Sequence, residues 1–356
     1  MKTNSTYIIV TGSLGLIGYE TTLLFLNKGY SVLGIDNDLR GKLFNIKTQY
    51  NIKLERLKKH YPQTYMHHAD DIRNIVKMKR IFKAFGSNII SIIHTAAQTS
   101  HDWARKDPLL DFSVNAQATL SLLELFRTYS PYASFVFCST NKAYGDLVNK
   151  LPLIKAKSRY DLSKNHIYYQ GIPESFSIDQ STHSLFGSSK VAADILVQEY
   201  GRYFHLNTGI FRLGVIAGEY QSGALEQGFL SHLINEILIR KSFTIIGYGG
   251  CQVRDILHAR DVAQAFYLYV SNPSKGEVYN LGGGRNNSTS ILEVLDYVKK
   301  KTSLSIQIKV LKQARAGDHK WWVSDFSKFQ KHYPAWKPSI PLYSLVDSII
   351  KYAQSR

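Results

Sequence analysis

The stretch that decides the fold is YIIVTGSLGLIGYE (Tyr7–Glu20), in which an apolar run leads into Gly12, Gly15 and Gly18. The apolar run predicts a buried strand, and residues 16–25 continue with helical character. Glycines at this spacing permit a tight turn, close approach of backbone N–H groups to a pyrophosphate, and contact between helix and strand. The helix N-terminus adds partial positive charge. The stretch therefore predicts a strand–turn–helix unit that binds a dinucleotide.

Two acids follow strand patterns in the manner expected of an adenosine-binding site. Ser31 to Asp36 is a second buried-strand pattern, and Asp36 lies at roughly the 20-residue offset of a ribose-binding carboxylate. Such a carboxylate accepts hydrogen bonds from ribose hydroxyls and repels a 2′-phosphate, which favours NAD, whereas nearby Arg40 keeps NADP open. Asp71 ends a third short strand pattern. It has two interpretations, a partner of the adenine amine or the N-cap of a helix over 74–85.

Strand and helix patterns then alternate along the chain. Strands are predicted at 88–94, 134–137 and 208–212, and helices at 112–128 and 185–204. This alternation predicts an α/β fold with a doubly wound parallel sheet. Ligands of such sheets bind beyond the carboxyl ends of the strands, where Gly12, Asp36, residues 96–100 and Thr140 fall.

The segments outside this alternation are less regular. Residues 37–63 are polar and rich in lysine, and Ile46, Leu54 and Leu57 predict a helix with one apolar face. Residues 160–177 show neither period and are expected to form a loop bordering the active site. The last third holds short elements. They are predicted as a strand at 243–246, a turn at 247–250, a strand at 277–281 and a helix at 290–300.

These patterns predict two domains of unequal size. The larger is a dinucleotide-binding domain of residues 1–213 that also receives 247–270. The smaller is a mixed C-terminal lobe of residues 214–246 and 271–356 that binds substrate.

Composition bounds the class of protein. With 356 residues, 44% hydrophobic and 20% charged, the chain has ample core for one large or two modest domains. It has no run of about 18 apolar residues and no apolar signal region, so we expect a cytoplasmic protein. Its two cysteines, Cys138 and Cys251, lie far apart in sequence, so neither a disulfide framework nor a metal site is expected.

The net charge of +17, from 44 Lys+Arg against 27 Asp+Glu, favours anionic ligands. Nucleic acid or an acidic membrane surface would be alternative partners. The lysines are scattered, however, with no basic helix or interleaved aromatic platform. We therefore expect a solvated lysine-rich surface that helps attract a diphosphate, and neither a nucleic-acid nor a membrane partner.

Taken in order, the motifs resemble the extended short-chain dehydrogenase/reductase family of nucleotide-sugar epimerases and dehydratases. The motifs, spread over residues 7–325, are TGxxGxxG at Thr11–Gly18, Asp36, Ala96-Ala97, Asn115, Ser139-Thr140 with Tyr144-Gly145, Lys190, and Val253-Arg254-Asp255 with His258 and Asp261. TNKAYGD at 140–146 and QVRDILH at 252–258 look most like the CDP-paratose (CDP-tyvelose) 2-epimerase branch. In the 4,6-dehydratases the threonine precedes an Asp-Glu pair that eliminates water, so Asn141-Lys142 disfavours dehydration.

The resemblance implies a fold, a cofactor and a chemistry. The fold is a Rossmann domain with a substrate lobe, and tightly held NAD takes a hydride from a ring carbon and returns it to the other face of the resulting ketone. In the family, a tyrosine in Tyr-x-x-x-Lys removes the hydroxyl proton, the lysine lowers the pKa of that tyrosine and bonds the nicotinamide ribose, and a serine or threonine holds the substrate hydroxyl.

The chain departs from this motif, because it reads Phe186-Gly-Ser-Ser-Lys190. Phenylalanine cannot accept a proton, which leaves three interpretations: a base from elsewhere, a tyrosine-to-phenylalanine substitution made to trap substrate, or binding without turnover. We favour the first, because an imidazole or carboxylate just beyond the fourth strand suits a general base at neutral pH. The candidate bases are His101, Asp102 and Tyr144, with Thr140 as a relay.

The candidate site residues combine the motifs with the resemblance. The catalytic candidates are Thr140, Lys190, His101 and the position of Phe186. The cofactor-binding candidates are Gly12, Gly15, Leu16, Ile17, Gly18, Asp36, Asn37, Asp71, Ile72, Thr95, Ala96, Ala97, Asn115, Ser139 and Lys190. The substrate-binding candidates are Gln98, Ser100, His101, Asn141, Gln227, Phe229, Arg254, Arg315 and Asp318. Among them, the guanidinium forks of Arg254 and Arg315 suit a diphosphate.

The leading hypothesis is an NAD-dependent nucleotide-sugar epimerase. One alternative is a net redox enzyme, a nucleotide-sugar reductase or oxidase that releases its cofactor, and another is a catalytically silent nucleotide-sugar-binding protein. In the family, helices corresponding to 112–128 and 185–204 pair with their copies in a homodimer. The seam would be formed by Ala192, Ala193, Leu196 and Val197, unless these residues only cover the sheet.

Overall fold

The computed structural model describes residues 6–46, 48–221 and 228–355. The chain forms two compact units. The first comprises Met1–Ser139, Ser188–Phe211 and Val262–Tyr279, and the second comprises Thr140–Gly187, Arg212–Asp261 and Asn280–Arg356. This division differs from the expected one, since residues 140–187 and 247–261 belong to the second unit and residues 271–279 to the first. The physical reason is that residues after Thr140 pack in a core of the second unit, around Tyr144 and Trp322.

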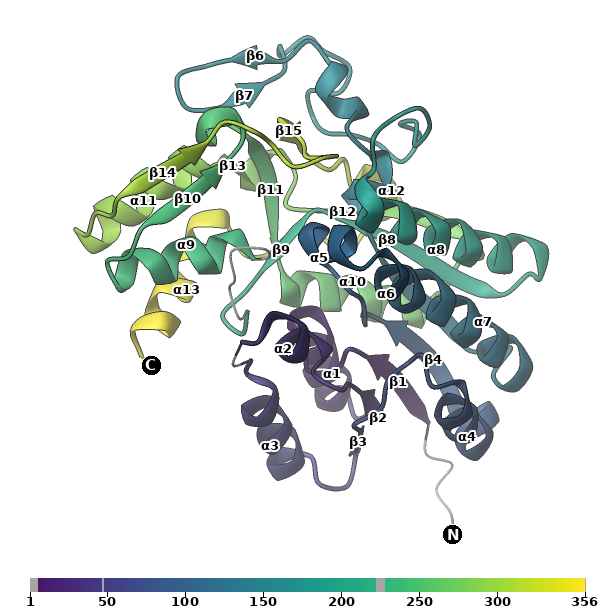
Figure 1. Cartoon of the computed structure of the whole chain (residues 1–356). Helices are drawn as coiled ribbons and strands as arrows, with labels where there is room; N and C mark the ends of the chain where they lie inside the picture. Colours follow the sequence, from purple (N-terminus) through teal and green to yellow (C-terminus); the bar gives the residue numbers. More distant parts are fainter. Residues whose placement is uncertain (1–5, 47, 222–227, 356) are drawn as a thin grey trace. The chain divides into compact units, whose positions relative to one another are not determined.

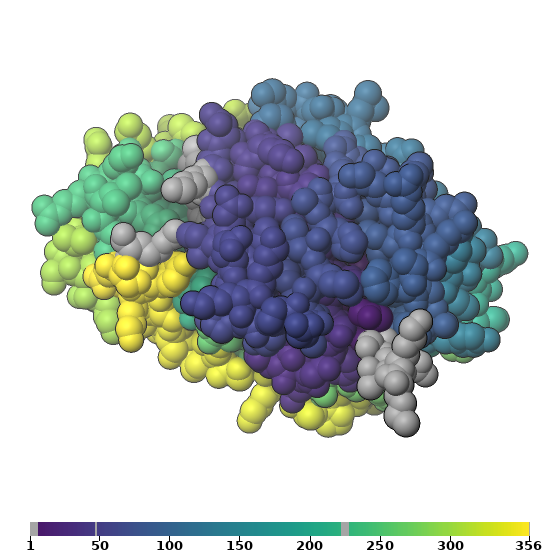
Figure 2. Space-filling view, turned by 90° about the horizontal axis from the view of Figure 1, so that it is seen from below, coloured from purple at the N-terminus to yellow at the C-terminus, as the bar shows by residue number. Residues whose placement is uncertain are grey.

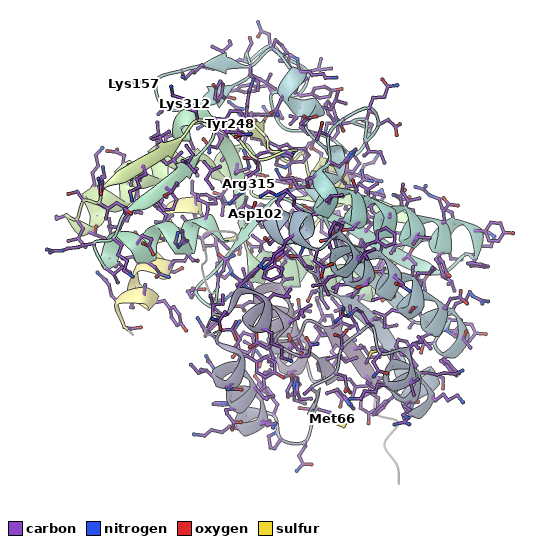
Figure 3. All side chains as sticks on the ribbon, in the orientation of Figure 1. Met66, Asp102, Lys157, Tyr248, Lys312 and Arg315 are labelled. Carbon is purple, nitrogen blue, oxygen red and sulfur yellow. The ribbon has the colours of Figure 1, made fainter. Side chains whose placement is uncertain are left out.

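Among the described residues, seven strands form one sheet, in the order β12-β8-β5-β4-β1-β2-β3 (Figure 1). The strands are β1 (Tyr7–Thr11), β2 (Ser31–Ile35), β3 (Tyr65–His68), β4 (Ile89–His94), β5 (Ser134–Thr140), β8 (Asn207–Leu213) and β12 (Glu277–Leu281). Pairing from β3 through β5 is parallel, with Ile9 opposite Leu33 on β2 and Ile92 on β4. Met66 on β3 lies at the edge of the sheet (Figure 3). The strand order reverses between β1 and β4, which is the switch point of a doubly wound sheet.

Helices cover both faces of this sheet, as predicted. They are α1 (Leu16–Asn27), α2 (Leu39–Phe44), α3 (Tyr50–His60), α4 (Ile75–Phe85), α5 (His101–Lys106), α6 (Pro108–Phe112), α7 (Ala118–Tyr129), α8 (Ser184–Tyr203) and α10 (Ala259–Ser271). On one face, Phe82 of α4 and Phe126 of α7 pack in a core with Phe135 of β5. On the other, the ring of Phe25 on α1 meets Tyr267 of α10 edge to face, with ring centres 5.8 Å apart.

The helix α8 corrects part of the expected dimer seam. Ala193 and Val197 are completely buried in the core of the sheet, and Leu196 packs against that core. Ala192 is half-buried. Ala193 and Val197 therefore cover the sheet, because a helix that packs on a sheet turns its small and branched residues inward.

Three local predictions also need correction. Residues 37–63 contain two helices, α2 and α3, and Ile46 lies between them, whereas Leu54 and Leu57 are buried on α3 as expected. The predicted helix 112–128 is divided into the end of α6, a π-helical turn over Ser113–Gln117, and α7. Asp71 is not the cap of α4, because the side chain of Asn74 accepts the Lys77 N–H.

The second unit is built of short strands and helices. Its strands are β6 (Ile154–Lys155), β7 (Tyr160–Asp161), β9 (Val215–Ala217), β10 (Phe243–Ile246), β11 (Val253–His258), β13 (Ser288–Ser290), β14 (Ile308–Leu311) and β15 (Trp321–Trp322). Its helices are α9 (Phe229–Leu238), α11 (Ile291–Thr302), α12 (Ser327–His332) and α13 (Leu342–Gln354). In the expected loop 160–177, only the first two residues form a strand, which pairs with β6.

The N-terminal segments, coloured purple to blue in Figure 2, form much of one face and carry several of the lysines predicted to be solvated. Lys58 and Lys59 of α3 and Lys79 and Lys83 of α4 are all exposed. Within the described ranges, no helix has both the length and the apolar character needed to span a membrane.

Candidate functional site

The glycine-rich turn between β1 and α1 is packed so closely that side chains do not fit. Gly12 has φ +69°, and a Cβ atom there would lie 2.8 Å from the backbone nitrogen of Ala96. A Cβ atom on Gly18 would lie 2.0 Å from the carbonyl oxygen of Gly12. The turn therefore needs glycine at both positions, and it brings the end of β1 against the residues after β4.

The first turn of α1 has free backbone donors. Its N-cap is Gly15, which offers no capping side chain, and the first turn carries no acidic residue. The N–H groups of Leu16 and Ile17 belong to the helix start that has no intrahelical acceptor. Together with the partial positive charge of the helix end, these donors fit the pyrophosphate of a dinucleotide.

Asp36 lies at the end of β2, next to the glycine-rich turn. One carboxylate oxygen accepts the N–H of Leu14 at 2.9 Å, and the other accepts the N–H of Asp38 at 2.9 Å. Burial raises the pKa of this carboxyl, although the two N–H bonds oppose the rise. A carboxylate fixed in this way has lone pairs left for the hydroxyls of a ribose.

Asn37, Asp71 and Ile72 lie beside Asp36 or follow β3. The Asn37 amide donates to Asp71 at 3.2 Å, and the guanidinium of Arg73 donates to the same carboxylate at 2.7 Å. Burial raises the pKa of Asp71, but hydrogen bonds and charge from Arg73 outweigh it and lower the pKa overall. Ile72 is buried in the core of the sheet, so only its backbone can reach a ligand.

The small residues after β4 are tied to β1. The hydroxyl of Thr95 donates to the carbonyl of Thr11 at 2.7 Å, and the N–H of Ala96 donates to the Thr11 hydroxyl at 3.2 Å. Thr95, Ala96 and Ala97 are half-buried, with no bulky side chain between the backbone and an approaching ligand. Their role as cofactor-binding residues stays a prediction.

Lys190 of α8 has an unusual environment for a lysine, because its side chain is only 3% exposed. Its ammonium lies 4.1 Å from the ring centre of Phe137. Burial lowers its pKa to about 8, while Cys138, Asp194 and Asp111 oppose that shift. Within the described part of the chain, this ammonium makes no hydrogen bond. A buried ammonium with donors to spare fits ribose hydroxyls.

Two predicted substrate-binding residues, Gln98 and Ser100, belong to a hydrogen-bonded network near Lys190. The backbone N–H of Gln98 donates to Asn115 at 2.9 Å, and the Gln98 side chain donates to Asp111 at 2.7 Å. The Ser100 hydroxyl is the N-cap of α5. Gln98 and Ser100 are both buried, and the Gln98 amide is one of the donors to Asp111, a buried carboxylate that residue spacing did not identify. Their role as substrate-binding residues stays a prediction.

Ser139, at the end of β5, also forms a hydrogen bond within the first unit. Its hydroxyl donates to Asp194 at 2.5 Å, and Gln198 donates to the other oxygen of the same carboxylate at 2.6 Å. The hydroxyl of Ser139 therefore holds Asp194, which in turn lies one helical turn from Lys190 on α8.

The turn after β5, in the second unit, contains Tyr144, one of the candidate bases. The Thr140 hydroxyl accepts the N–H of Lys142 at 3.2 Å and so caps the short 3₁₀ helix that follows. Tyr144 is completely buried, and its hydroxyl donates to Asn280 at 2.8 Å. Burial raises the pKa of Tyr144 to about 12. Tyr144 is thus unsuited to act as a base, because burial opposes the loss of its proton.

His101 and Asp102 open helix α5 and are half-buried. Asp102 is labelled in Figure 3. Their role as base stays a hypothesis.

Phe186 lies in the first turn of α8 and is 7% exposed. The same part of the helix packs on the turn after Thr140, since a Cβ atom on Gly187 would lie 3.2 Å from the Lys142 carbonyl oxygen. His183 Nε2 also pairs with the Ala143 carbonyl at 3.0 Å. The structure therefore brings the position of the missing phenol to the Thr140 turn. Helical spacing puts Phe186 and Lys190 on one face of α8.

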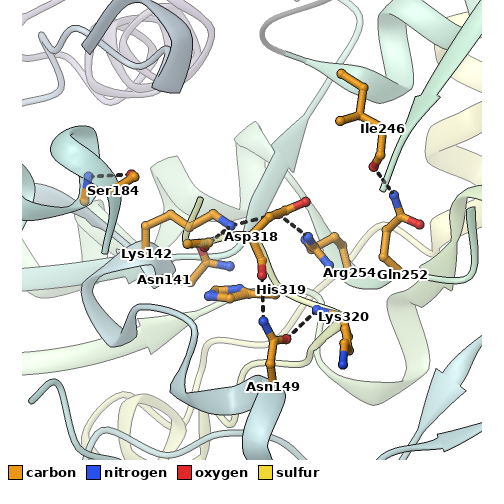
Figure 4. Close-up of polar contacts among 12 residues, drawn as sticks. Asn141, Lys142, Asn149, Ser184, Ile246, Gln252, Arg254, Asp318, His319 and Lys320 are labelled. Atoms are coloured by element: carbon orange, nitrogen blue, oxygen red, sulfur yellow. Dashed lines mark hydrogen bonds and ion pairs between the residues drawn. The ribbon is translucent and has the colours of Figure 1, made fainter. Parts of the chain in front are cut away.

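Two cations share one carboxylate in the second unit (Figure 4). The guanidinium of Arg254 lies 2.6 Å from Asp318 Oδ1, and the ammonium of Lys142 lies 3.0 Å from the same oxygen. Burial alone would raise the pKa of Asp318, but Lys142 and Arg254 hold it far below its usual value. Two positive charges on one negative charge leave the cluster cationic and suited to a phosphate.

Arg315, labelled in Figure 3, adds to this cluster. Burial lowers the pKa of Lys142 while Asp318 opposes the shift, and the charge of Arg315 is among the further causes of lowering. The predicted residues Arg254, Arg315 and Asp318 are thus brought together. Lys142 was missed as part of this cluster, because its sequence context pointed only to the absence of the dehydratase acid.

Other residues around Asp318 could not be identified from the sequence. The Asn149 amide donates to the Asp318 carbonyl at 2.8 Å, and the Tyr248 hydroxyl donates to it at 3.3 Å. The ring of Tyr160 meets that of Tyr248 edge to face, with ring centres 6.4 Å apart. The only signal for Tyr248 was its place in the glycine-rich turn before Arg254.

Of the other predicted substrate residues in the second unit, Asn141 lies next to Lys142 at this cluster (Figure 4). Asn141 is buried within the 3₁₀ helix, and Phe229 opens α9 and packs against that unit's second core. Gln227 lies outside the described residues. Over the described ranges, no group of three or more His, Cys, Asp and Glu side chains is arranged to hold a metal ion.

Comparison with known proteins gives one family. The model of the NAD dependent epimerase/dehydratase family matches residues 8–282. The CDP-paratose 2-epimerase of Salmonella typhi is 29% identical over 98% of this chain and 99% of its own length. A putative UDP-glucose 4-epimerase of Methanocaldococcus jannaschii is 25% identical, with 98% of each chain covered.

Solved structures with the same fold include nucleotide-sugar epimerases. The UDP-glucose 4-epimerase of Thermotoga maritima, with UDP-glucose, has a TM-score of 0.77 at 23% identity and covers 98% of this chain and 99% of its own. The UDP-glucose 4-epimerase of Thermus thermophilus, complexed with NAD, gives the same TM-score of 0.77, identity of 23% and coverage of 98% and 99%.

Proposed function

We propose, from the premise that this chain belongs to the NAD dependent epimerase/dehydratase family, that it epimerises a nucleoside-diphosphate sugar through a transient ketone. The observation that carries the proposal is the cationic cluster of Lys142 and Arg254 on Asp318, because a buried excess of positive charge requires an anionic ligand. The uncapped glycine-rich turn and Asp36 support the cofactor half of the proposal.

The residues of the first unit fit NAD. The turn Gly12–Gly18 and the start of α1 would hold its pyrophosphate, Asp36 its adenosine ribose, and Lys190 its nicotinamide ribose. When bound, NAD supplies an acceptor and then a donor of hydride. Lys190 stays mostly protonated near neutral pH, because its pKa is about 8, and so can hold the ribose hydroxyls through charge-assisted bonds.

The substrate is proposed as a CDP-sugar, epimerised at C2, because the Salmonella typhi relative carries that name at 29% identity over nearly the whole chain. Lys142, Arg254 and Arg315 would bind the diphosphate. The test is to incubate the purified protein with CDP-, UDP- and dTDP-hexoses in deuterated water and follow ring stereochemistry by NMR. Inversion with a UDP-sugar alone would reject the CDP assignment, and binding without any inversion would reject turnover.

The missing phenol is the main question about mechanism. We propose His101, with Asp102, as the replacement base and Thr140 as the group that holds the substrate hydroxyl, because Phe186 carries no acceptor and Tyr144 is buried. A Phe186→Tyr variant tests this directly. A large gain in activity would mean that Phe186 disables the usual base, whether by nature or by substitution. No gain, together with loss of activity in His101→Gln, would support the alternative base.

Two rival functions differ in the fate of the cofactor. A reductase or oxidase must exchange NAD, whereas an epimerase returns the hydride and can keep it. Absorbance and release of NAD from purified protein distinguish them, and a protein that lacks bound NAD would favour the redox alternative.

We also propose a homodimer formed by α7 and α8. Its support is the exposed apolar side chains on these helices, Leu120 at 38% and Ile195 at 44%. Light scattering with Ile195→Asp as the variant tests the assembly. The cytoplasmic location stays a prediction that cell fractionation can test.

A further inference from the structure

Lys53, on helix α3, reaches under the glycine-rich turn. It comes from the segment 37–63, which the proposed function leaves without a role. Its side chain is only 4% exposed, although lysine is almost never buried without a partner. Its ammonium donates to the carbonyl of Leu14 at 2.9 Å and to that of Gly15 at 3.5 Å. In the preceding peptide, the N–H of Leu14 donates to Asp36 at 2.9 Å.

We propose that Lys53 is a positioning residue for the dinucleotide, one that fixes the peptides of the turn so that their donors face the pyrophosphate. The shorter of the two bonds, at 2.9 Å, holds the carbonyl of Leu14, which shares a planar trans peptide with the N–H of Gly15. That N–H donates to the carbonyl of Gly12 at 3.0 Å, and the carbonyl of Gly15 also accepts the N–H of Tyr19 at 3.1 Å. A cation on the Leu14 carbonyl therefore fixes the peptide that directly precedes the donors of Leu16 and Ile17. Asp36 and Lys53 thus hold neighbouring peptides of the turn by an anion and a cation.

The charge of Lys53 adds to this effect. The charged groups that face its ammonium are the carboxylates of Asp36, Glu20 and Asp38 and the guanidinium of Arg40. The ring of Tyr19 lies under it, with its centre 5.2 Å from Nζ. Burial lowers the pKa of Lys53 to about 8, with the carboxylates opposing that shift. The positive charge is therefore present at neutral pH and is lost at moderately alkaline pH.

Affinities for ADP and adenosine test the inference, because only ADP carries the pyrophosphate, and neither ligand has the second ribose that Lys190 would hold. Excess CDP is present throughout, so that the proposed diphosphate site at Asp318 is already filled. Lys53→Met keeps the length of the side chain and removes its charge and donors. We expect its dissociation constant for ADP to rise about 10- to 100-fold, since bonds from charged groups are strong. The constant for adenosine should stay unchanged. In the wild type, ADP affinity should fall above about pH 8, and in Lys53→Met it should not vary there.

The matched control is Lys59→Met, the same change at an exposed position of the same helix. Equal losses for ADP and adenosine in a folded Lys53→Met, or wild-type affinity for both, would overturn the inference. Should that variant not fold, Lys53→Gln, which keeps donors without charge, takes its place, and a flat wild-type pH profile for ADP overturns the inference by itself.

The inference rests on the proposed place of the dinucleotide, and Asp36→Asn separates the two. If Asp36→Asn leaves adenosine affinity unchanged, the dinucleotide is not where we propose. If Asp36→Asn lowers the affinity for adenosine while Lys53→Met leaves the affinity for ADP unchanged, only the proposed role of Lys53 is wrong.

Discussion

The glycine-rich turn of the first unit and the Asp318 cluster of the second both suit phosphates, but they are built differently. The turn uses main-chain N–H groups from residues close together in sequence, with glycine at 12 and 18 because no Cβ atom fits. The cluster uses the charged ends of Lys142 and Arg254, which come from distant segments and meet on Asp318. A site made of backbone thus leaves a sequence motif, whereas a site made of long side chains leaves scattered residues.

The two sites should therefore fail in different ways when altered. The backbone site should be sensitive to added volume, and the side-chain site should be sensitive to lost charge.

The largest effect is expected for Gly18→Ala. Its Cβ atom would lie 2.0 Å from a backbone oxygen that cannot move aside cheaply, so the turn must open. We expect NAD affinity to fall about 100-fold, which corresponds to about 3 kcal/mol, the upper end of the usual cost of overpacking, because the same turn carries the contacts. NAD released from purified protein measures this. Gly29→Ala, where a Cβ atom meets nothing within 4 Å, controls for general loss of stability.

A smaller but selective effect is expected for Arg254→Met. Among the described residues, the variant leaves Lys142 as the cation paired with Asp318 and lowers the positive charge of the cluster by one. The dissociation constant for a nucleoside diphosphate should rise about 10- to 100-fold, with NAD content unchanged. Calorimetry measures this dissociation constant. The control variant is Lys312→Met, the loss of a positive charge at an exposed position. Loss of NAD in Arg254→Met would contradict the separation of the two sites.

Lys190→Met should stabilise the cofactor-free protein while abolishing activity. Its folded pKa of about 8 lies below the value of 10.5 for free lysine, so burial of the charge costs stability at neutral pH. The unfolded chain binds the extra proton between these values, so wild-type stability rises with pH across that window. We expect the variant to gain about 1–3 kcal/mol at pH 7.

Urea unfolding at several pH values measures this gain as a difference from wild type, which cancels the contribution of Lys53. The gain should shrink as pH rises from about 8 to about 10.5. A gain that does not vary with pH would mean that packing, not charge, is the cause.

The smallest effect is expected for Asn74→Ala, which removes the cap of α4. Loss of such a cap costs about 1 kcal/mol in the free energy of unfolding. Neither nucleotide site should change affinity, because Asn74 makes its bond within the helix start. A change in NAD content would show that the helix start supports the adenosine end of the site.

The sequence predicts the fold well because the fold depends on short-range patterns. The apolar runs of β1, β2, β4 and β5 and the glycine spacing identify a doubly wound sheet without knowledge of any distant contact. The segment 37–63 was harder, because Asn45 adopts a left-handed conformation that ends α2, and weak periodicity does not reveal such a break.

The candidate site was predicted in part. The cofactor candidates at residues 12–18 follow from the turn. Asn115 and Lys190, and the substrate candidates Arg254, Arg315 and Asp318, follow from the resemblance. Gln98 and Ser100 were placed on the substrate, but their partners lie inside the protein. Nothing local distinguishes a buried amide from an exposed one, since both sit in the same kind of loop after β4.

The sequence by itself determined the sheet, the glycine turn, the acid at Asp36 and the absence of a phenol at 186, because each depends on residue type and spacing along the chain. Tertiary structure alone decided that Tyr144 is buried against Asn280, that Lys142 shares Asp318 with Arg254, and that Lys53 reaches the carbonyl of Leu14. The reason is that burial and hydrogen bonding depend on which distant segments pack together, and packing fixes partners that spacing cannot specify.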